Sequence, residues 1–417
     1  MYHQLELVVP TKHYRSVMKN TILFQKACRA LELGNDILRG RSSAVYAHPM
    51  DRIRVEADFL RDIKPTALDV AICQRLLSAY LHAVEDRTRY CSSKNEDIWT
   101  AIAKRQRIFF ELLDGNDPAQ LAAYLCNMSR HDATHGTVQG ESEYRHLKRS
   151  GRYRAYIARM AKDKLVSLAE AVGAIPCENP EQGSWGRNSL ISEMVLAKKI
   201  EGAIGISIIP PDIDGGLFKV GLDPYRFGER DCNAIYTAWL MRGLLPKGQS
   251  VSVCEIGGGV GRVAYWAARL GIDRYTLFDL PHVNVLQGFY LLKALPNVNI
   301  CLYGESSNNT TMDTSIQVMP GYACREVGRH NSIDLVLNQD SFPEIHADIV
   351  VDYLKWIQVA TSLFLSINHE SQPNAGNGTL QNNVPDLISR VGGFSRELRH
   401  PYWLRKGYVT ELYRTAE

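Results

Sequence analysis

A glycine-rich loop after a short apolar segment is the part of this sequence whose residue types are best suited to chemistry. Residues 251–256 are mostly apolar or β-branched, and an apolar helical pattern follows over residues 261–270. Glycine permits tight turns and lets a backbone approach a ligand closely. The loop between these segments contains Gly257, Gly258, Gly259 and Gly261. The sequence therefore predicts a buried strand, a glycine loop and a helix that together form a cofactor site.

Two acidic residues lie at the ends of consecutive predicted strands. Glu255 comes just before the glycine loop, and Asp279 ends the next apolar segment, where Leu280 follows it. Ionised carboxylates are strong acceptors for ammonium and hydroxyl donors. Two such acids suit a ligand with an amino-acid part on one side and ribose hydroxyls on the other. S-Adenosylmethionine fits this description, and we expect these three residues and the loop glycines to bind it.

Two other interpretations of the loop are open. A dinucleotide site would place a pyrophosphate at the glycine turn and the helix N-terminus. Against it, the spacing is Gly257-x-Gly259-x-Gly261 rather than G-x-G-x-x-G, the motif begins after residue 250, and Glu255 would repel a pyrophosphate. A glycine turn with only a structural role is the remaining alternative. We favour a methyl-donor site.

Two groups of polar residues follow predicted strands nearer the C-terminus. The first contains Asn338, Gln339, Asp340 and Glu344, and the second contains Asn368, His369 and Glu370. Polar groups in such places are costly to bury unless they find partners in the fold or in a ligand. In open parallel sheets, ligands bind beyond the carboxyl ends of the strands. We therefore expect both groups to face one cleft and to form an active site.

The elements that position these residues indicate an α/β fold. We expect a helical lid and acceptor domain over residues 1–172, a connector rich in glycine and proline over 173–248, and a cofactor-binding domain over 249–417. In the last part strands and helices alternate, which predicts a parallel sheet with crossover helices. The expected strands are 251–256, 275–279, 298–303, 333–338 and 362–367, the expected helices are 261–270, 283–295 and 347–360, and residues 394–416 should form a closing antiparallel pair.

Length and composition set broad limits. A chain of 417 residues is long enough for two domains with ample cores. Its apolar runs are far shorter than a membrane span, and the N-terminus lacks the layout of a signal peptide, so we expect a soluble, cytoplasmic protein without a membrane partner. Nine cysteines with no Cys-x-x-Cys pair indicate neither a disulfide framework nor a cysteine zinc site.

Charge is unevenly distributed along the chain. Residues 1–165 contain 27 Lys and Arg against 19 Asp and Glu, a net +8, which leaves 21 against 26, a net −5, for the remainder. A basic half could attract a nucleic acid, but these charges occur singly along predicted helices rather than in a basic block with interleaved aromatics. We therefore expect a solvated helical surface and no nucleic-acid partner.

Several of these segments resemble one protein family, the sugar O-methyltransferases of bacterial natural-product clusters, of the nanchangmycin type. The segments are 255–262, 278–281, 337–344 and 366–370, with 179–186 and 405–413 flanking them. The resemblance covers about residues 165–415. It implies a Rossmann-like class I methyltransferase fold and a sugar hydroxyl as the acceptor, in a free sugar or a glycosylated natural product.

Methyl transfer from a sulfonium to an alcohol requires in-line geometry, exclusion of water and a base for the hydroxyl proton. His369 is the preferred base, because an imidazole titrates near neutral pH, and Glu370 or Asp340 could orient it. His369 could instead be a strand-end histidine that only hydrogen-bonds a loop. His282 is a second candidate base and a candidate for contact with the substrate.

We expect the other polar residues to contact the cofactor or the sugar. Asn338 and Gln339 could contact the methionine end of the cofactor, while Asp340 and Glu344 could receive sugar hydroxyls. A magnesium ion held by Asp340, Glu344 and Glu370 is an alternative. Paired acids at the fourth and fifth strand ends are absent, so we expect no metal.

A histidine pair raises the question of zinc. His131 and His135 have the spacing of zinc ligands on one helix face, but Gly136 follows at once and no third ligand is obvious. A role in a loop or in a substrate pocket is favoured.

Taken as a whole, the sequence predicts an S-adenosylmethionine-dependent O-methyltransferase that acts on a small-molecule sugar or glycoside. A homodimer is one option for its assembly. An RNA methyltransferase that uses the basic front half and a non-catalytic scaffold that binds the cofactor are the alternatives.

Overall fold

The computed structural model describes residues 55–90, 98–179, 181, 186–305, 315–327, 333–370 and 381–416. The described residues fall into two units, a larger one within residues 55–177 and 191–416 and a smaller one within residues 178–190. In the smaller unit, the carboxylate of Glu178 accepts hydrogen bonds from the backbone N–H groups of Gly186 and Asn188, just before a 3₁₀ turn at Asn188–Leu190. The strands and the α-helices that the structure describes belong to the larger unit. No described helix is long and apolar enough to cross a membrane.

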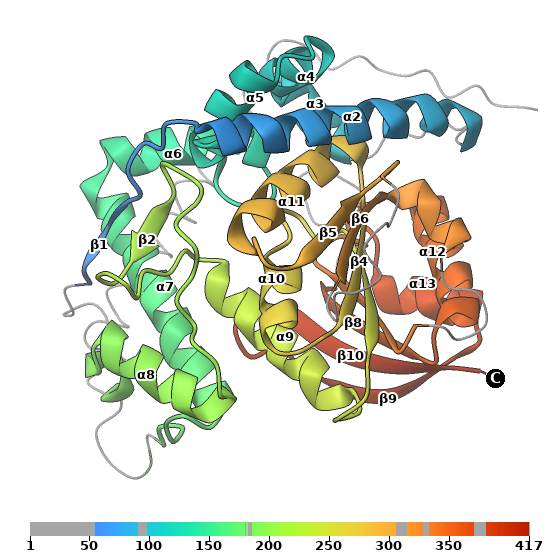
Figure 1. Cartoon of the computed structure of the whole chain (residues 1–417). Coiled ribbons are helices and arrows are strands. Elements are labelled where there is room, and N and C mark those ends of the chain that lie inside the picture. The colour runs from blue at the N-terminus through green and yellow to red at the C-terminus, as the bar shows by residue number, and fades with distance from the viewer. Residues whose placement is uncertain are drawn as a thin grey trace, which may run out of the picture. The chain divides into compact units, whose positions relative to one another are not determined.

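An eight-stranded sheet forms the centre of the larger unit (Figure 1). Its strand order is β5-β6-β4-β3-β7-β8-β10-β9. The strands from β3 to β8 run parallel, and β10 and then β9 join antiparallel at one edge. The strands are β3 (Ser252–Ile256), β4 (Arg274–Asp279), β5 (Asn299–Leu302), β6 (Ser315–Pro320), β7 (Leu335–Gln339), β8 (Leu363–His369), β9 (Phe394–Pro401) and β10 (Tyr408–Thr415). This mixed α/β sheet confirms the predicted Rossmann-like class I methyltransferase fold and the closing antiparallel pair.

Helices cover both faces of the sheet, as Figure 1 shows. Val253 and Leu335 pack in one core with α9, α10 and α11, while Cys254 and Val336 pack in a second core with α12 and α13. Burial on both faces explains why β3 and β7 are apolar along most of their lengths. The helices are α9 (Asp231–Leu244), α10 (Arg262–Arg269), α11 (Pro281–Ala294), α12 (Ala347–Ala360) and α13 (Val384–Val391).

One strand of the eight-stranded sheet was not expected from the sequence. β6 lies between β4 and β5, so the expected strand at 298–303, which is β5, is an edge strand rather than a neighbour of β4. Buried and half-buried residues alternate along β6, and Ile316 and Val318 supply its fully covered apolar side chains. Such a short alternating pattern gives a weaker signal than the continuous apolar runs of β3 and β7.

The described residues before the sheet are mainly helical, as expected. Its helices are α2 (Ala67–Tyr90), α3 (Ile98–Arg105), α4 (Arg107–Asp114), α5 (Pro118–Leu125), α6 (Gly140–Arg149), α7 (Gly151–Ala171) and α8 (Glu193–Ile204). Helix α2 packs on α11, where a Cβ at Gly288 would lie 2.4 Å from the Leu76 side chain. An unexpected two-stranded ribbon joins β1 (Ala57–Phe59) to β2 (Phe218–Val220). The domain limits at residues 172 and 248 stay predictions.

Candidate active site

A cavity of about 500 Å³ opens at the carboxyl ends of β3, β4 and β7. Its walls include the glycine loop, the two strand ends beside it in the sheet, the start of α9, the segment before α6, the turn after β6, and α12. The lining residues include Glu255, Gly257, Gly258, Gly259, Asp279, Leu280, Gln339, Asp340, Ser341, Glu344, Arg230, Asn233, Gly136 and Thr137. Segments far apart in the sequence therefore share one concave space, which is the kind of site that binds small molecules.

The glycine loop adopts a backbone that other residues rarely adopt. Gly257, Gly259 and Gly261 have φ values of +75°, +58° and +85°. A Cβ at Gly257 would lie 2.2 Å from Ser341 Oγ, and one at Gly258 would lie 2.5 Å from a methyl group of Leu277. The loop therefore turns tightly between β3 and α10 because glycine leaves room for both neighbours.

Glu255 lies beneath this loop and lines the cavity. The Tyr275 hydroxyl donates a hydrogen bond of 2.9 Å to its Oε2. Burial raises the pKa of the Glu255 carboxyl to about 8, against the smaller lowering effect of that hydrogen bond. A ligand that placed a hydrogen-bond donor or a positive charge beside this carboxyl would lower its pKa and favour the ionised form.

Asp279 occupies the matching place at the end of β4. Its carboxylate accepts hydrogen bonds from the backbone N–H of Leu280 at 2.8 Å and from Nε2 of Gln287 at 2.9 Å. Burial raises the pKa of Asp279 to about 7 despite these donors. Asp279 and Leu280 both line the cavity, beside the glycine loop.

Asn338 is fully buried at the end of β7 and is occupied by protein partners. Its Nδ2 donates to the carbonyl oxygen of Ile256 at 3.0 Å and to Ser341 Oγ at 2.6 Å. Its Oδ1 accepts from Nδ2 of Asn368 at 2.9 Å and from the backbone N–H of Phe342 at 3.3 Å. Asn338 thus ties the end of β3 to the loop after β7, and the expected contact with the cofactor stays a prediction.

Asp340 lines the cavity, but its carboxylate is engaged by three side chains. It accepts from Nη1 of Arg230 at 3.1 Å, from Arg405 and from the Tyr408 hydroxyl. Its φ of +67° places it in the left-handed region, where its backbone N–H donates to the carbonyl oxygen of Ile367 at 3.0 Å. The Asp340 carboxylate therefore holds the guanidinium groups of Arg230 and Arg405 beside the cavity.

Glu344 faces the cavity from the loop after β7. No hydrogen-bond donor among the described residues reaches its carboxylate. Burial raises the pKa of Glu344 to about 7, and the neighbouring Asp340 carboxylate adds to that rise, while Arg230 and Arg405 oppose it. A carboxyl that titrates near neutral pH in a cavity can act as a proton acceptor.

The polar residues after β8 have other surroundings. His369 Nε2 lies 2.9 Å from Oε1 of Gln381, and Glu370 accepts two hydrogen bonds of 2.9 Å from Arg399. Asn368 bonds to Asn338 and to Ser366. Within the described part of the chain, the residues that line the cavity include none of these three. Their catalytic roles stay predictions, without a shared cleft to support them.

His282 lies in the first turn of α11, where its ring packs 4.9 Å from that of Phe110. Burial lowers its pKa to about 4, and nearby Arg87 lowers it further. The imidazole is therefore neutral near pH 7, and it lies outside the cavity lining formed by the described residues.

His131 and His135 do not share one helix face. His131 lies between two 3₁₀ turns, Met128–Arg130 and Asp132–Thr134, and its ring stacks on that of Tyr124 with centroids 4.3 Å apart.

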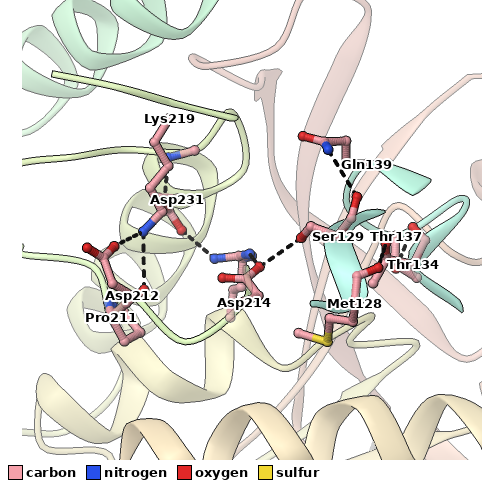
Figure 2. Close-up of polar contacts among 12 residues, drawn as sticks. Met128, Ser129, Thr134, Thr137, Gln139, Pro211, Asp212, Asp214, Lys219 and Asp231 are labelled. Carbon is pink, nitrogen blue, oxygen red and sulfur yellow. Dashed lines mark hydrogen bonds and ion pairs between the residues drawn. The ribbon is translucent and has the colours of Figure 1, made fainter. Parts of the chain in front are cut away.

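A buried ionic network behind the glycine loop was missed by the sequence reasoning. Arg262, the first residue of α10, donates to Asp231 at 2.7 Å and to Asp214 at 3.0 Å. Ser129 donates to the same Asp214 at 3.1 Å, and its carbonyl oxygen accepts from Gln139 at 3.0 Å (Figure 2). The network fixes the start of α10 against α9 and the 128–140 segment. An arginine at the first position of an apolar helix was the available signal, since a buried guanidinium requires an anion.

Two further residues that sequence reasoning missed come from the start of α9. Arg230 and Asn233 line the cavity, whereas the aromatic rings of Tyr225 and Phe227 just before them pack in the core. The Tyr225 hydroxyl donates to Glu201 at 2.9 Å. The segment before the glycine loop therefore supplies polar groups to the site, while its aromatic residues attach the connector to the core.

Neither protein-family models nor curated proteins match this sequence, but solved structures resemble the fold. The mitomycin 7-O-methyltransferase MmcR aligns over 94% of this chain and 100% of its own, with 14% identity and a TM-score of 0.35. The CcbJ methyltransferase from Streptomyces caelestis aligns over 44% and 90%, with 15% identity and a TM-score of 0.33. The pyocyanin biosynthetic protein PhzM aligns over 45% and 56%, with 12% identity and a TM-score of 0.33, so this chain spans just over half of that protein.

Proposed function

We propose that this protein is an S-adenosylmethionine-dependent O-methyltransferase that methylates a hydroxyl group of a small molecule. The observation that carries the proposal is the cavity of about 500 Å³ in which the glycine loop, Asp279 and Glu344 face the same space. One wall has the groups that an adenosyl amino acid requires, and another has a proton acceptor for an alcohol.

The residues present fit the cofactor. Asp279 is a half-buried residue at the cavity, desolvation raises the pKa of its carboxyl to about 7, and ribose hydroxyls would supply donors that favour its ionised form. The left-handed backbone at Gly257 and Gly259, which glycine adopts without strain, allows the chain to turn beside a ligand without side chains in the way. When bound, S-adenosylmethionine supplies an electrophilic methyl group on its sulfonium.

Glu344 is the proton acceptor that the geometry favours. It lines the cavity, has no hydrogen-bond donor among the described residues, and has a pKa raised to about 7 by burial. His369 was preferred from the sequence, but it bonds to Gln381 and is not among the lining residues that the structure describes. Glu344 would accept the hydroxyl proton at a carboxylate oxygen as the alcohol oxygen attacks.

Sugars and glycosides are the acceptors that we propose. The sequence resemblance to sugar O-methyltransferases supports this class, and a carboxylate at Glu344 suits a hydroxyl-rich ligand. Glu344 comes from the loop after β7, outside the glycine loop that we assign to the donor.

Donor binding and methyl transfer test the proposal in two steps. Calorimetry with S-adenosylhomocysteine should show saturable binding, and labelled S-adenosylmethionine should transfer its methyl group to members of a panel of sugars, glycosides and glycosylated polyketides. A chelator arm tests metal dependence, and an RNA arm tests the alternative acceptor. Absence of donor binding would refute the whole proposal, whereas transfer to RNA alone would refute the acceptor class.

A further inference from the structure

Two amide oxygens at the cavity have no hydrogen-bond donor among the described residues. They are Oδ1 of Asn233, in the first turn of α9, and Oε1 of Gln339, the last residue of β7. Asn233 is only 5% exposed. A buried carbonyl oxygen without a donor is costly, and native proteins rarely keep one without a reason. Two such atoms in one cavity indicate that a ligand supplies the donors.

One tyrosine brings these two residues together. The Tyr402 hydroxyl donates to the backbone carbonyl oxygen of Asn233 at 3.1 Å, and Thr237 Oγ1 lies 3.1 Å from the same hydroxyl. The side chain of Gln339 lies close to the same Tyr402 hydroxyl. Its Oε1 has no donor among the described residues, so this oxygen is left for a ligand.

The charged groups nearby show which ligand group belongs here. The Asp340 carboxylate already accepts from Arg230, Arg405 and Tyr408, so it does not need a further donor. Arg230 lines the cavity three residues before Asn233 and has more N–H groups than the one it gives to Asp340. Two neutral acceptors beside a guanidinium are complementary to an α-amino acid, which has an ammonium group next to a carboxylate.

We propose that Asn233 and Gln339 accept hydrogen bonds from the α-ammonium group of S-adenosylmethionine, with the Arg230 guanidinium beside its α-carboxylate. This inference rests on the proposed function and assigns the amino-acid end of the donor to α9 and the end of β7. The adenosine end then lies toward Asp279 and Leu280. Glu344 stays available to the acceptor hydroxyl.

The test compares two ligands that differ in the amino-acid part. S-Adenosylhomocysteine has the ammonium and carboxylate groups, whereas 5′-methylthioadenosine has the same nucleoside and thioether without them. Calorimetry should show that Asn233→Leu weakens S-adenosylhomocysteine binding about tenfold or more, as expected for the loss of a charge-assisted hydrogen bond. Binding of 5′-methylthioadenosine should stay within about twofold of the native value. Asn233→Asp, which keeps an acceptor oxygen, should retain S-adenosylhomocysteine binding.

A matched control separates this effect from general damage to the fold. Thr410 on β10 is also buried, and its Oγ1 also lacks a donor among the described residues, but it does not line the cavity. Thr410→Val should leave both affinities unchanged. If Asn233→Leu weakened both ligands equally, or neither, the assignment would be overturned while the proposed function stood. If the native protein bound neither ligand, the proposed function itself would fail.

Discussion

The ends of β7 and β8 lie side by side in the sheet, yet their polar side chains have different surroundings. After β7, Gln339 and Glu344 face the cavity, and Asp340 holds Arg230 at its edge. After β8, His369 and Glu370 are bonded to Gln381 and Arg399. The two neighbouring strand ends therefore differ in their carboxyl groups: Arg399 satisfies that of Glu370, whereas that of Glu344 faces the cavity without a donor among the described residues.

The neighbours of each strand explain the difference. β7 lies next to β3, where the glycine loop turns away and Gly257 leaves room for Ser341. β8 lies next to β10, and β9 beyond it contributes Arg399, which bridges Glu370 and Glu411. The strong donors of Arg399 already satisfy the carboxylate beside β8, whereas the end of β7 borders open space.

The largest expected effect comes from closing the space beside the end of β7. Gly257→Ala would place a Cβ 2.2 Å from Ser341 Oγ at a φ of +75°. We expect a loss of about 2–4 kcal/mol in the free energy of unfolding and at least about a 100-fold loss of S-adenosylhomocysteine affinity. Denaturant unfolding and calorimetry measure the two.

Gly271→Ala is the matched control, because Gly271 has a φ of +76° and no atom lies within 4 Å of the position that a Cβ would take there. It should cost only about 1–2 kcal/mol, from the backbone conformation alone, and leave donor affinity unchanged. Equal effects of the two substitutions on donor affinity would show that the contact with Ser341 does not shape the site.

The same substitution at each strand end tests the comparison directly. Glu344→Gln removes the proton acceptor and should lower kcat about 100-fold, with the dissociation constant of the donor unchanged. Glu370→Gln alters a partly exposed ion pair with Arg399 and should leave kcat within about twofold. Single-turnover methyl transfer at saturating donor measures both, and comparable losses would remove the distinction between the strand ends.

A pH dependence follows from the raised pKa of Glu344. Its pKa lies at about 7 in the folded chain against 4.5 without burial, so the folded chain keeps a proton that the unfolded chain has lost. The free energy of unfolding should therefore fall as pH rises from about 4.5 to about 7. After allowance for solvent screening, Glu344 should account for about 1–2 kcal/mol of that fall. Unfolding curves of the native chain and Glu344→Gln between these pH values should differ by this amount, and identical slopes would contradict the assignment.

The smallest effect is expected at the histidine. His369→Gln removes a ring that lies 2.9 Å from Gln381 and has no place in the described cavity lining. We expect kcat to stay within about threefold of the native value, since the proton acceptor is elsewhere. A loss as large as that of Glu344→Gln, at an unchanged melting temperature, would restore His369 as the base.

Local sequence patterns were sufficient for much of the fold. The apolar segment before Gly257, the glycine spacing and the next strand end at Asp279 predicted β3, its loop, α10 and β4 within a few residues. Continuous apolar runs between turn signals indicate strands that are buried on both faces. β6 was missed because only Ile316 and Val318 mark it strongly.

Much of the site could not be predicted in the same way. Asn233 and Arg230 come from the start of a helix that precedes the glycine loop, and no spacing in the sequence connects them to Gln339. The partners of Arg262, Asp231 and Asp214, lie 31 and 48 residues away. These contacts form only when the connector, residues 173–248, folds against the start of α10.

A glycine turn with acids at two strand ends could be read from the order of residues alone, because backbone freedom and strand periodicity are local properties. Which strand-end carboxylates remain free was settled only by the packing of the folded chain. Asp340 and Glu370 are neutralised by arginines from remote segments, while Glu344 is half-buried at the cavity without an ion-pair partner among the described residues. The chemistry of a carboxylate depends on the donors and the solvent around it, and these are set by distant segments that fold against it.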